Sequence, residues 1–154
     1  MGETDLAIHI MREVGQWCID AACPMWTLEE LSREALLKHS PEENDFRVAR
    51  VGGEPVAAMI LQWQDREFWP EIAEGDSGFI HKLCVRRAFA GIGLSTCMVN
   101  AAAAECRKRG AGFLRLDTYV RRPKLCSLYE GMGFVKVGYR SVGGREYALY
   151  ELKI

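Results

Sequence analysis

The chain has 154 residues, of which 49% are hydrophobic and 27% charged, and its formal net charge is −1. This length and composition fit one soluble globular domain over residues 1–154 with a core of its own. The near-neutral balance excludes a global attraction to nucleic acid or to anionic membranes. No apolar run approaches the roughly 18 residues that a membrane span needs.

Six cysteines are spread along the chain, at positions 18, 23, 84, 97, 106 and 126. None forms a Cys-x-x-Cys pair, and no histidine lies at metal-ligand spacing from two cysteines. Several fall on apolar stripes of predicted helices or strands, as reduced core cysteines do. We therefore expect a cytoplasmic protein that holds no metal.

The first half of the chain predicts two helices and a hairpin. Residues 4–21 carry apolar side chains at helical spacing, with Thr4 as the expected cap. Residues 27–39 form a second predicted helix, because Thr27 and Glu30 make a capping-box pattern. A β-hairpin is predicted over residues 46–63, with its turn at Gly52-Gly53. The polar segment 64–78 then forms a loop that is unusually rich in aromatic side chains.

The second half predicts alternating strands and helices. Residues 79–85 are mostly apolar on both faces, which favours a central strand. A helix over 95–109 follows, ended by Gly110, and then come a strand over 112–120 and a short helix over 123–131. Two last strands pair around Gly143-Gly144. The order ααββ-βαβα-ββ predicts an α/β (α+β) fold with a mixed, mostly antiparallel sheet flanked by helices.

A glycine-bearing turn lies between the strand over 79–85 and the helix over 95–109. Gly91 and Gly93 stand where the turn opens the helix, so backbone N–H groups there can face an anion without side chains in between. A dinucleotide fingerprint would place its third glycine at Thr96, and no Gly-Lys-Ser/Thr is present for a Walker motif. The turn thus favours a phosphorylated carrier other than a dinucleotide or the nucleotide bound by a Walker motif.

The stretch VRRAFAGIGLS, followed by LYEGMGF, resembles the GCN5-related N-acetyltransferases, which use acetyl-CoA. In that family a basic or glutamine residue, a glycine three positions on and a small residue two positions further bind the pyrophosphate. Aligned on Val85, these positions fall on Ala90, Gly93 and Ser95. Ala90 thus replaces the basic residue, for which Arg86 or Arg87 could substitute, and Ser95 can itself hydrogen-bond a phosphate.

The resemblance implies a set of CoA-binding residues. The strand end would pair with the pantetheine arm, and one of its N–H groups would bond the thioester oxygen as its negative charge develops. Arg122 stands where the family often has an asparagine, seven residues before the tyrosine of LYEGMGF. The expected contacts are Leu83, Cys84, Val85, Ala90, Gly91, Ile92, Gly93, Leu94, Ser95, Thr96 and Arg122.

Two residues are predicted to move protons. By resemblance Tyr129 points at the CoA sulfur, and a phenol with an ordinary pKa of about 10 can protonate a thiolate. His81, on the central strand, suits the role of base that deprotonates the amine. Each has a plain alternative as a core side chain, Tyr129 beside Phe134. A water relay or a carboxylate is the other candidate for the base, the carboxylates being Asp65, Glu67, Glu71, Glu74, Asp76 and Asp117.

The acceptor is expected to be a small-molecule amine. Aromatic walls and carboxylates suit a cation, and the predicted contacts are Trp63, Asp65, Trp69 and Asp117. The aromatic residues could instead pack a lid or a dimer contact, and Asp117 could cap the next helix or pair with Arg121. The last hairpin has exposed edges that suit a homodimer. We expect transfer of the acetyl group of acetyl-CoA to a primary amine by direct attack in a ternary complex; the alternative is a non-catalytic CoA-binding regulatory module.

Overall fold

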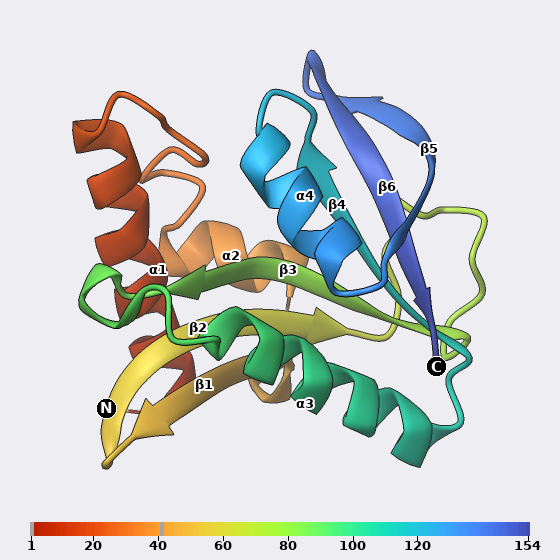
Figure 1. The fold of residues 1–154 in the computed structure, drawn as a ribbon, viewed down its shortest axis with the longest axis horizontal. Coiled ribbons are helices and arrows are strands. Elements are labelled where there is room, and N and C mark those ends of the chain that lie inside the picture. Colours follow the sequence, from red (N-terminus) through yellow and green to blue (C-terminus); the bar gives the residue numbers. More distant parts are fainter. Residues whose placement is uncertain (1, 41) are drawn as a thin grey trace. The chain divides into compact units, whose positions relative to one another are not determined.

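The computed structural model describes residues 2–40 and 42–154. Helices and strands follow in the predicted order ααββ-βαβα-ββ, with two short 3-10 turns at Glu43–Asp45 and Arg87–Phe89 (Figure 1). Their bounds are α1 (Glu3–Asp20), α2 (Arg33–His39), β1 (Phe46–Val51), β2 (Glu54–Gln62), β3 (Ser77–Val85), α3 (Leu94–Arg109), β4 (Phe113–Tyr119), α4 (Pro123–Gly131), β5 (Val135–Val142) and β6 (Arg145–Lys153).

The six strands form one mixed sheet in the order β1-β2-β3-β4-β6-β5. The pairs β1–β2, β4–β6 and β5–β6 are antiparallel, whereas β3 and β4 run parallel. Helix α3 connects these two parallel strands, as a crossover between parallel neighbours must. The predicted fold class and the central place of β3 are therefore confirmed.

The chain divides into two compact units, and both β3 and α3 contribute to each. The first contains the described residues up to Leu61 together with Lys82–Val99, and the second contains Gln62–His81 and Asn100–Ile154. A single domain over residues 1–154 stays a prediction. None of the described helices combines the length and the apolar character needed to cross a bilayer.

In the first unit, α1 packs its apolar stripe against β1. Ala7, Met11, Val14 and Cys18 follow the spacing of one helix face and are all buried. Gly15 lies on the same side, where an added Cβ would come within 2.5 Å of a methyl group of the fully buried Leu31. The core of this unit therefore depends on close contact between α1 and the segment before α2.

Two predicted helix starts are wrong. α1 begins at Glu3 with Gly2 as its N-cap, so Thr4 lies within the first turn and is buried. Thr27 and Glu30 do exchange the two capping-box hydrogen bonds, at 2.7 and 3.1 Å, but they close a turn. The helix α2 starts later, where Ser32 accepts a hydrogen bond from the Ala35 N–H. Local bonds of the capping type also stabilise isolated turns, so the pattern alone does not place a helix start.

In the second unit, β4, β6 and β5 form a three-stranded antiparallel ladder that is covered on both faces. On one face α4 is held to β6 by a hydrogen bond from Tyr150 to Glu130. Leu149 points to the opposite face, because side chains alternate along a strand, and it packs there with Trp69 and Phe79. The loop between β2 and β3 thus covers the face opposite to α4, and this face carries the candidate site.

Candidate functional site

His81 and Asp117 are brought together by the register of two parallel strands. The pairing of β3 with β4 runs from Ser77 opposite Phe113 to Ile80 opposite Leu116. His81 and Asp117 are the next residues of the two strands, and both point to the face that Phe79 occupies. His81 Nδ1 consequently lies 3.8 Å from Asp117 Oδ1.

Asp65 reaches the same point from the loop between β2 and β3. Its Oδ1 accepts hydrogen bonds from the N–H groups of Glu67 and Phe68, at 3.0 and 2.9 Å, and its own carbonyl accepts one from Trp69. This arrangement is an Asx turn, which the aspartate side chain stabilises from within. A hydrogen bond from the Gly75 N–H to the Trp63 carbonyl closes the loop. Asp65 is therefore held by the backbone of its own loop.

Asp65 and Asp117 flank the two nitrogens of one imidazole. Asp65 Oδ2 lies 3.3 Å from His81 Nε2, and it accepts no hydrogen bond from the described residues. The side chains of Asp65 and Asp117 are 5% and 13% exposed, whereas that of His81 is 19% exposed. His81 is thus the most exposed of the three side chains. The Nε2 atom itself is buried, so the accessible part of the ring lies elsewhere.

One oxygen or nitrogen from each of Asp65, His81 and Asp117 lies within 4.8 Å of the others, which is close enough to consider a metal ion. The two carboxylates, however, face different nitrogens of the ring. The same three side chains can therefore serve either to move a proton or to hold a cation.

Aromatic and charged side chains surround the cluster on the same face. Phe68 packs edge-on against Tyr147 with ring centroids 5.0 Å apart, and Tyr147 in turn lies 5.9 Å from Tyr119. Arg115, on the same face, stacks over Trp69 and donates a hydrogen bond to Ser77. Its guanidinium also pairs with Glu151 at 3.1 Å and with Asp76 at 3.8 Å. The buried guanidinium therefore ties the loop end to β4 and β6.

The two tryptophans predicted to contact an acceptor differ in their surroundings. Trp69 is only 3% exposed and packs on Phe79, so it belongs to the core under the loop. Trp63 is half-buried and carries the Arg109 guanidinium 4.0 Å from its ring centroid. Contact of either residue with an acceptor stays a prediction.

Tyr129 lies in α4 and is 7% exposed. Its ring packs edge-on against Phe134, with centroids 5.8 Å apart, so the expected neighbour is present. The adjacent Glu130 accepts a 2.8 Å hydrogen bond from Tyr150. Arg122 is the N-cap residue of α4, where its carbonyl accepts hydrogen bonds from the first turn. The catalytic role of Tyr129 and the CoA contact of Arg122 stay predictions.

The glycine turn lies in the first unit, immediately before α3. Gly91 and Gly93 have φ angles of 80° and 85°, a backbone conformation that favours glycine, and no neighbour limits the space at either residue. Helix α3 starts at Leu94, and its first-turn N–H groups therefore follow directly. Leu83, Cys84 and Val85 end β3, after a left-handed residue at Lys82, whose φ is 51°.

Arg86 and Arg87, the residues considered as substitutes for the missing basic side chain, have other partners. Arg86 pairs with Glu13 at 3.0 Å and with Glu54 at 3.2 Å. The Arg87 guanidinium lies 3.9 Å from the ring centroid of Trp17. In this structure the glycine turn therefore offers backbone N–H groups rather than these two guanidinium groups.

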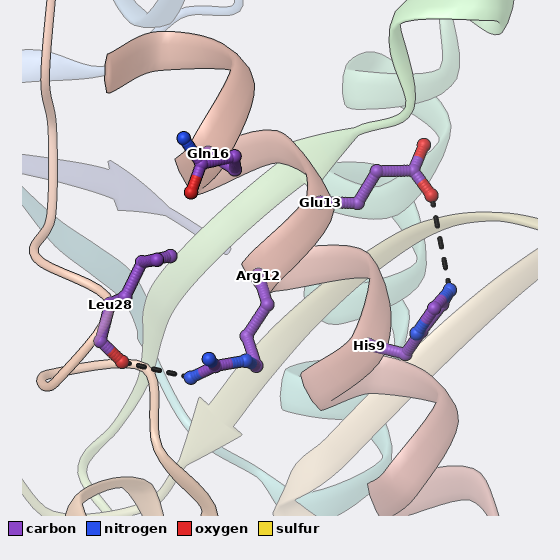
Figure 2. A pocket seen from close by; sticks show the side chains of 5 residues that line it. All are labelled: His9, Arg12, Glu13, Gln16 and Leu28. Atoms are coloured by element: carbon purple, nitrogen blue, oxygen red, sulfur yellow. Dashed lines mark hydrogen bonds and ion pairs between the residues drawn. The ribbon is translucent and has the colours of Figure 1, made fainter. Parts of the chain in front are cut away.

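A pocket of about 310 Å³ lies on α1, lined by His9, Arg12, Glu13, Gln16 and Leu28 (Figure 2). Arg12 donates a hydrogen bond to the carbonyl of Leu28, and His9 lies 4.0 Å from Glu13. An exposed pair one helical turn apart, such as His9 and Glu13, contributes little energy. The pocket contains no predicted site residue.

A family model described as the acetyltransferase (GNAT) family matches residues 11–134. The chain belongs to this family. It is also 30% identical over 107 residues to an uncharacterized N-acetyltransferase, YesJ, of Bacillus subtilis (strain 168), and the match covers 66% of this chain and 57% of that protein. The chain thus spans little more than half the length of this curated relative.

Solved structures of GNAT proteins share the fold. A GNAT-family acetyltransferase from Listeria monocytogenes superposes with a TM-score of 0.76 at 21% identity, over 100% of this chain and 92% of the other. A GNAT-family acetyltransferase from Elizabethkingia anophelis, solved with acetyl-CoA bound, gives a TM-score of 0.61 at 14% identity, over 80% of this chain and 84% of that one. At these identities the likeness concerns the fold alone.

Sequence reasoning named Asp65, His81 and Asp117 separately and missed that they form one cluster. The contact between His81 and Asp117 could have been predicted, since each residue comes near the end of a predicted strand and the two strands flank the same crossover helix. The contact of Asp65 with His81 could not have been predicted, because an Asx turn in a long loop leaves no periodic pattern in the sequence.

Proposed function

We propose that this GNAT protein transfers the acetyl group of acetyl-CoA to a primary amine of a small molecule. The observation that carries the proposal is the pair of left-handed glycines, Gly91 and Gly93, directly before α3 in a chain of this family. Helix N-termini with unobstructed N–H groups bind phosphate groups well. Acetyl-CoA bound in the GNAT neighbour from E. anophelis supports the choice of carrier.

In the proposed reaction the turn from Ala90 to Thr96 anchors the pyrophosphate, and Arg122 adds a phosphate contact. The last three residues of β3, Leu83 to Val85, pair with the pantetheine arm. A backbone N–H there stabilises the oxyanion as the amine attacks the thioester carbonyl. Tyr129 protonates the departing thiolate, and His81 takes the proton from the amine.

The acceptor is a cation in this proposal. Asp65 and Asp117 supply negative charge, and the neighbouring aromatic rings of Phe68 and Tyr147 supply a surface suited to an ammonium group. Trp63 and Trp69 are the remaining proposed acceptor residues. A homodimer through the exposed β5 edge is compatible with this reaction but is not required for it.

A thiol-release assay with acetyl-CoA tests the proposal against a panel of amines, amino acids, polyamines and aminoglycosides. We expect at least one amine to be acetylated, and we expect Tyr129→Phe to lower kcat by on the order of 100-fold while acetyl-CoA binding is kept. Tyr139→Phe is the matched control, because Tyr139 is 56% exposed on β5. An unchanged rate in Tyr129→Phe would remove this tyrosine from the mechanism. Acetyl-CoA binding without turnover across the panel would favour the non-catalytic module.

A further inference from the structure

We propose that Asp65 is a positioning residue for His81, which fixes the tautomer of the imidazole so that Nδ1 is the atom that accepts the proton of the amine. This rests on the proposed function, since it assigns the detailed role of the base in that reaction. In this proposal Asp65 acts by orienting His81, whereas the loop sequence alone suggested that Asp65 contacts the acceptor directly.

The first support is the fixed orientation of Asp65. Two backbone N–H groups hold Oδ1, and Oδ2 lies 3.3 Å from His81 Nε2 in an electrostatic contact that is not a hydrogen bond. Both Oδ2 and Nε2 are buried. A neutral ring with its lone pair on Nε2 would place that lone pair against a buried carboxylate oxygen, which is unfavourable in a low dielectric. The same holds more weakly at Nδ1, since Asp117 Oδ1 is farther away at 3.8 Å, so a neutral ring favours the proton on Nε2 and the lone pair on Nδ1.

The second support is the position of Asp117 on the other side of the ring. When the ammonium group of the acceptor loses its proton, an N–H bond breaks there and an N–H bond forms at Nδ1. The freed lone pair then attacks the thioester carbonyl. The new positive charge arises 3.8 Å from Asp117 Oδ1, so a carboxylate stabilises the imidazolium at each nitrogen.

Two arginines on this face, Arg115 and Arg140, already pair with carboxylates, Arg140 with Glu71 at 3.3 Å. Arg115 lies two residues before Asp117 on β4 and is engaged by Glu151 and Asp76. When the imidazole is neutral, this cluster of two carboxylates and one ring has a net negative charge. The net negative charge of the cluster falls when the ring takes up a proton, and this favours proton transfer from a cationic acceptor.

Asp65→Asn tests the assignment, because asparagine keeps the size of the side chain and an oxygen that can accept both N–H bonds of the loop. We expect kcat to fall on the order of 100-fold or more, as when a histidine is held in the wrong tautomer. We also expect the acid limb of the kcat/KM profile to move to lower pH, since a carboxylate that favours the protonated ring is gone. Asp20→Asn, at the exposed end of α1, is the control and should change neither quantity.

Imidazole ¹⁵N NMR of the whole protein gives a readout that does not need turnover. We expect the Nε2–H tautomer for neutral His81 in the native protein and a mixture, or the Nδ1–H tautomer, in Asp65→Asn. The NMR result stands even if no amine is acetylated, so failure of this inference and failure of the proposed function are distinguishable. Where Asp65→Asn does not fold, the tautomer of neutral His81 in the native protein decides the question alone.

Any of three results would overturn the inference. The first is a native protein whose neutral His81 carries its proton on Nδ1, and the second is a rate profile that Asp65→Asn leaves in place. The third is tight binding of one Zn²⁺ per chain that is lost in both His81→Ala and Asp65→Asn, because a ring nitrogen would then serve as a metal ligand.

Discussion

The buried Tyr150 hydroxyl donates a 2.8 Å hydrogen bond to Glu130 Oε1, and this contact joins β6 to α4 next to Tyr129. Burial, followed by the hydrogen bonds to Glu130 and Cys126, raises the pKa of the Tyr150 phenol above its ordinary value. The phenol is therefore protonated throughout the neutral range and acts as a constant donor. Its role is to hold α4 in place on the sheet.

Tyr150→Phe should lower the free energy of unfolding by about 1–2 kcal/mol. The variant loses a hydrogen bond to a carboxylate acceptor. Because Glu130 is exposed at the surface, this bond contributes less free energy than a fully buried one would. Urea denaturation of the variant and of Tyr139→Phe checks this. The exposed Tyr139 should change stability by less than about 0.5 kcal/mol. Equal effects in the two variants would show that the Tyr150–Glu130 contact does not stabilise α4.

Gly93→Ala should weaken CoA binding and also destabilise the protein. The φ of 85° at Gly93 lies in the region that costs an L residue about 1–2 kcal/mol, so the turn would relax and its N–H groups would be redirected. Calorimetric titration with CoA and urea denaturation measure the two effects. Gly112→Ala is the matched control, since Gly112 is outside the left-handed region and an added Cβ there meets nothing within 4 Å. A loss of stability with unchanged CoA affinity would argue against the turn as the pyrophosphate site.

Stability should fall above pH 9 in part because of Cys84. Burial raises the pKa of its thiol from 9.0 to about 12. Below pH 9 the thiol is protonated in both the folded and the unfolded chain, so it adds no pH dependence. Between pH 9 and 12 the unfolded chain loses the proton and the folded chain keeps it. The free energy of unfolding therefore drops by up to about 1.4 kcal/mol per pH unit from this group.

The comparison that isolates Cys84 is the slope of stability against pH between pH 8.5 and 10.5. Cys84→Ala should have a shallower slope than the native protein, whatever constant offset the smaller side chain adds. Cys23→Ala, at an exposed position, should keep the native slope. The raised pKa values of Cys106 and Tyr150 act in all three proteins and cancel in the comparison. Parallel slopes for Cys84→Ala and the native protein would contradict the prediction.

Much of the fold follows from local patterns in the sequence. Paired glycines mark both hairpin turns, Gly110 follows the last residue of α3, and Pro123 is the first residue of α4. These signals work because φ above zero and the missing N–H of proline restrict structure within a few residues. The predicted start of α2 was wrong because local hydrogen bonds do not determine whether a helix continues. Thr27 and Glu30 make their predicted bonds, but burial of the following residues decides where the helix continues.

The sequence by itself determined the order of elements, the glycine turn before α3 and the family, because each depends on contiguous residues. Only the tertiary structure decided that His81 lies between Asp65 and Asp117. These residues are 16 and 36 positions from His81 along the chain, and strand register and an Asx turn bring them together. Register is set by side-chain packing across the whole sheet and a loop conformation by its own hydrogen bonds, so neither could be deduced from the spacing of the three residues.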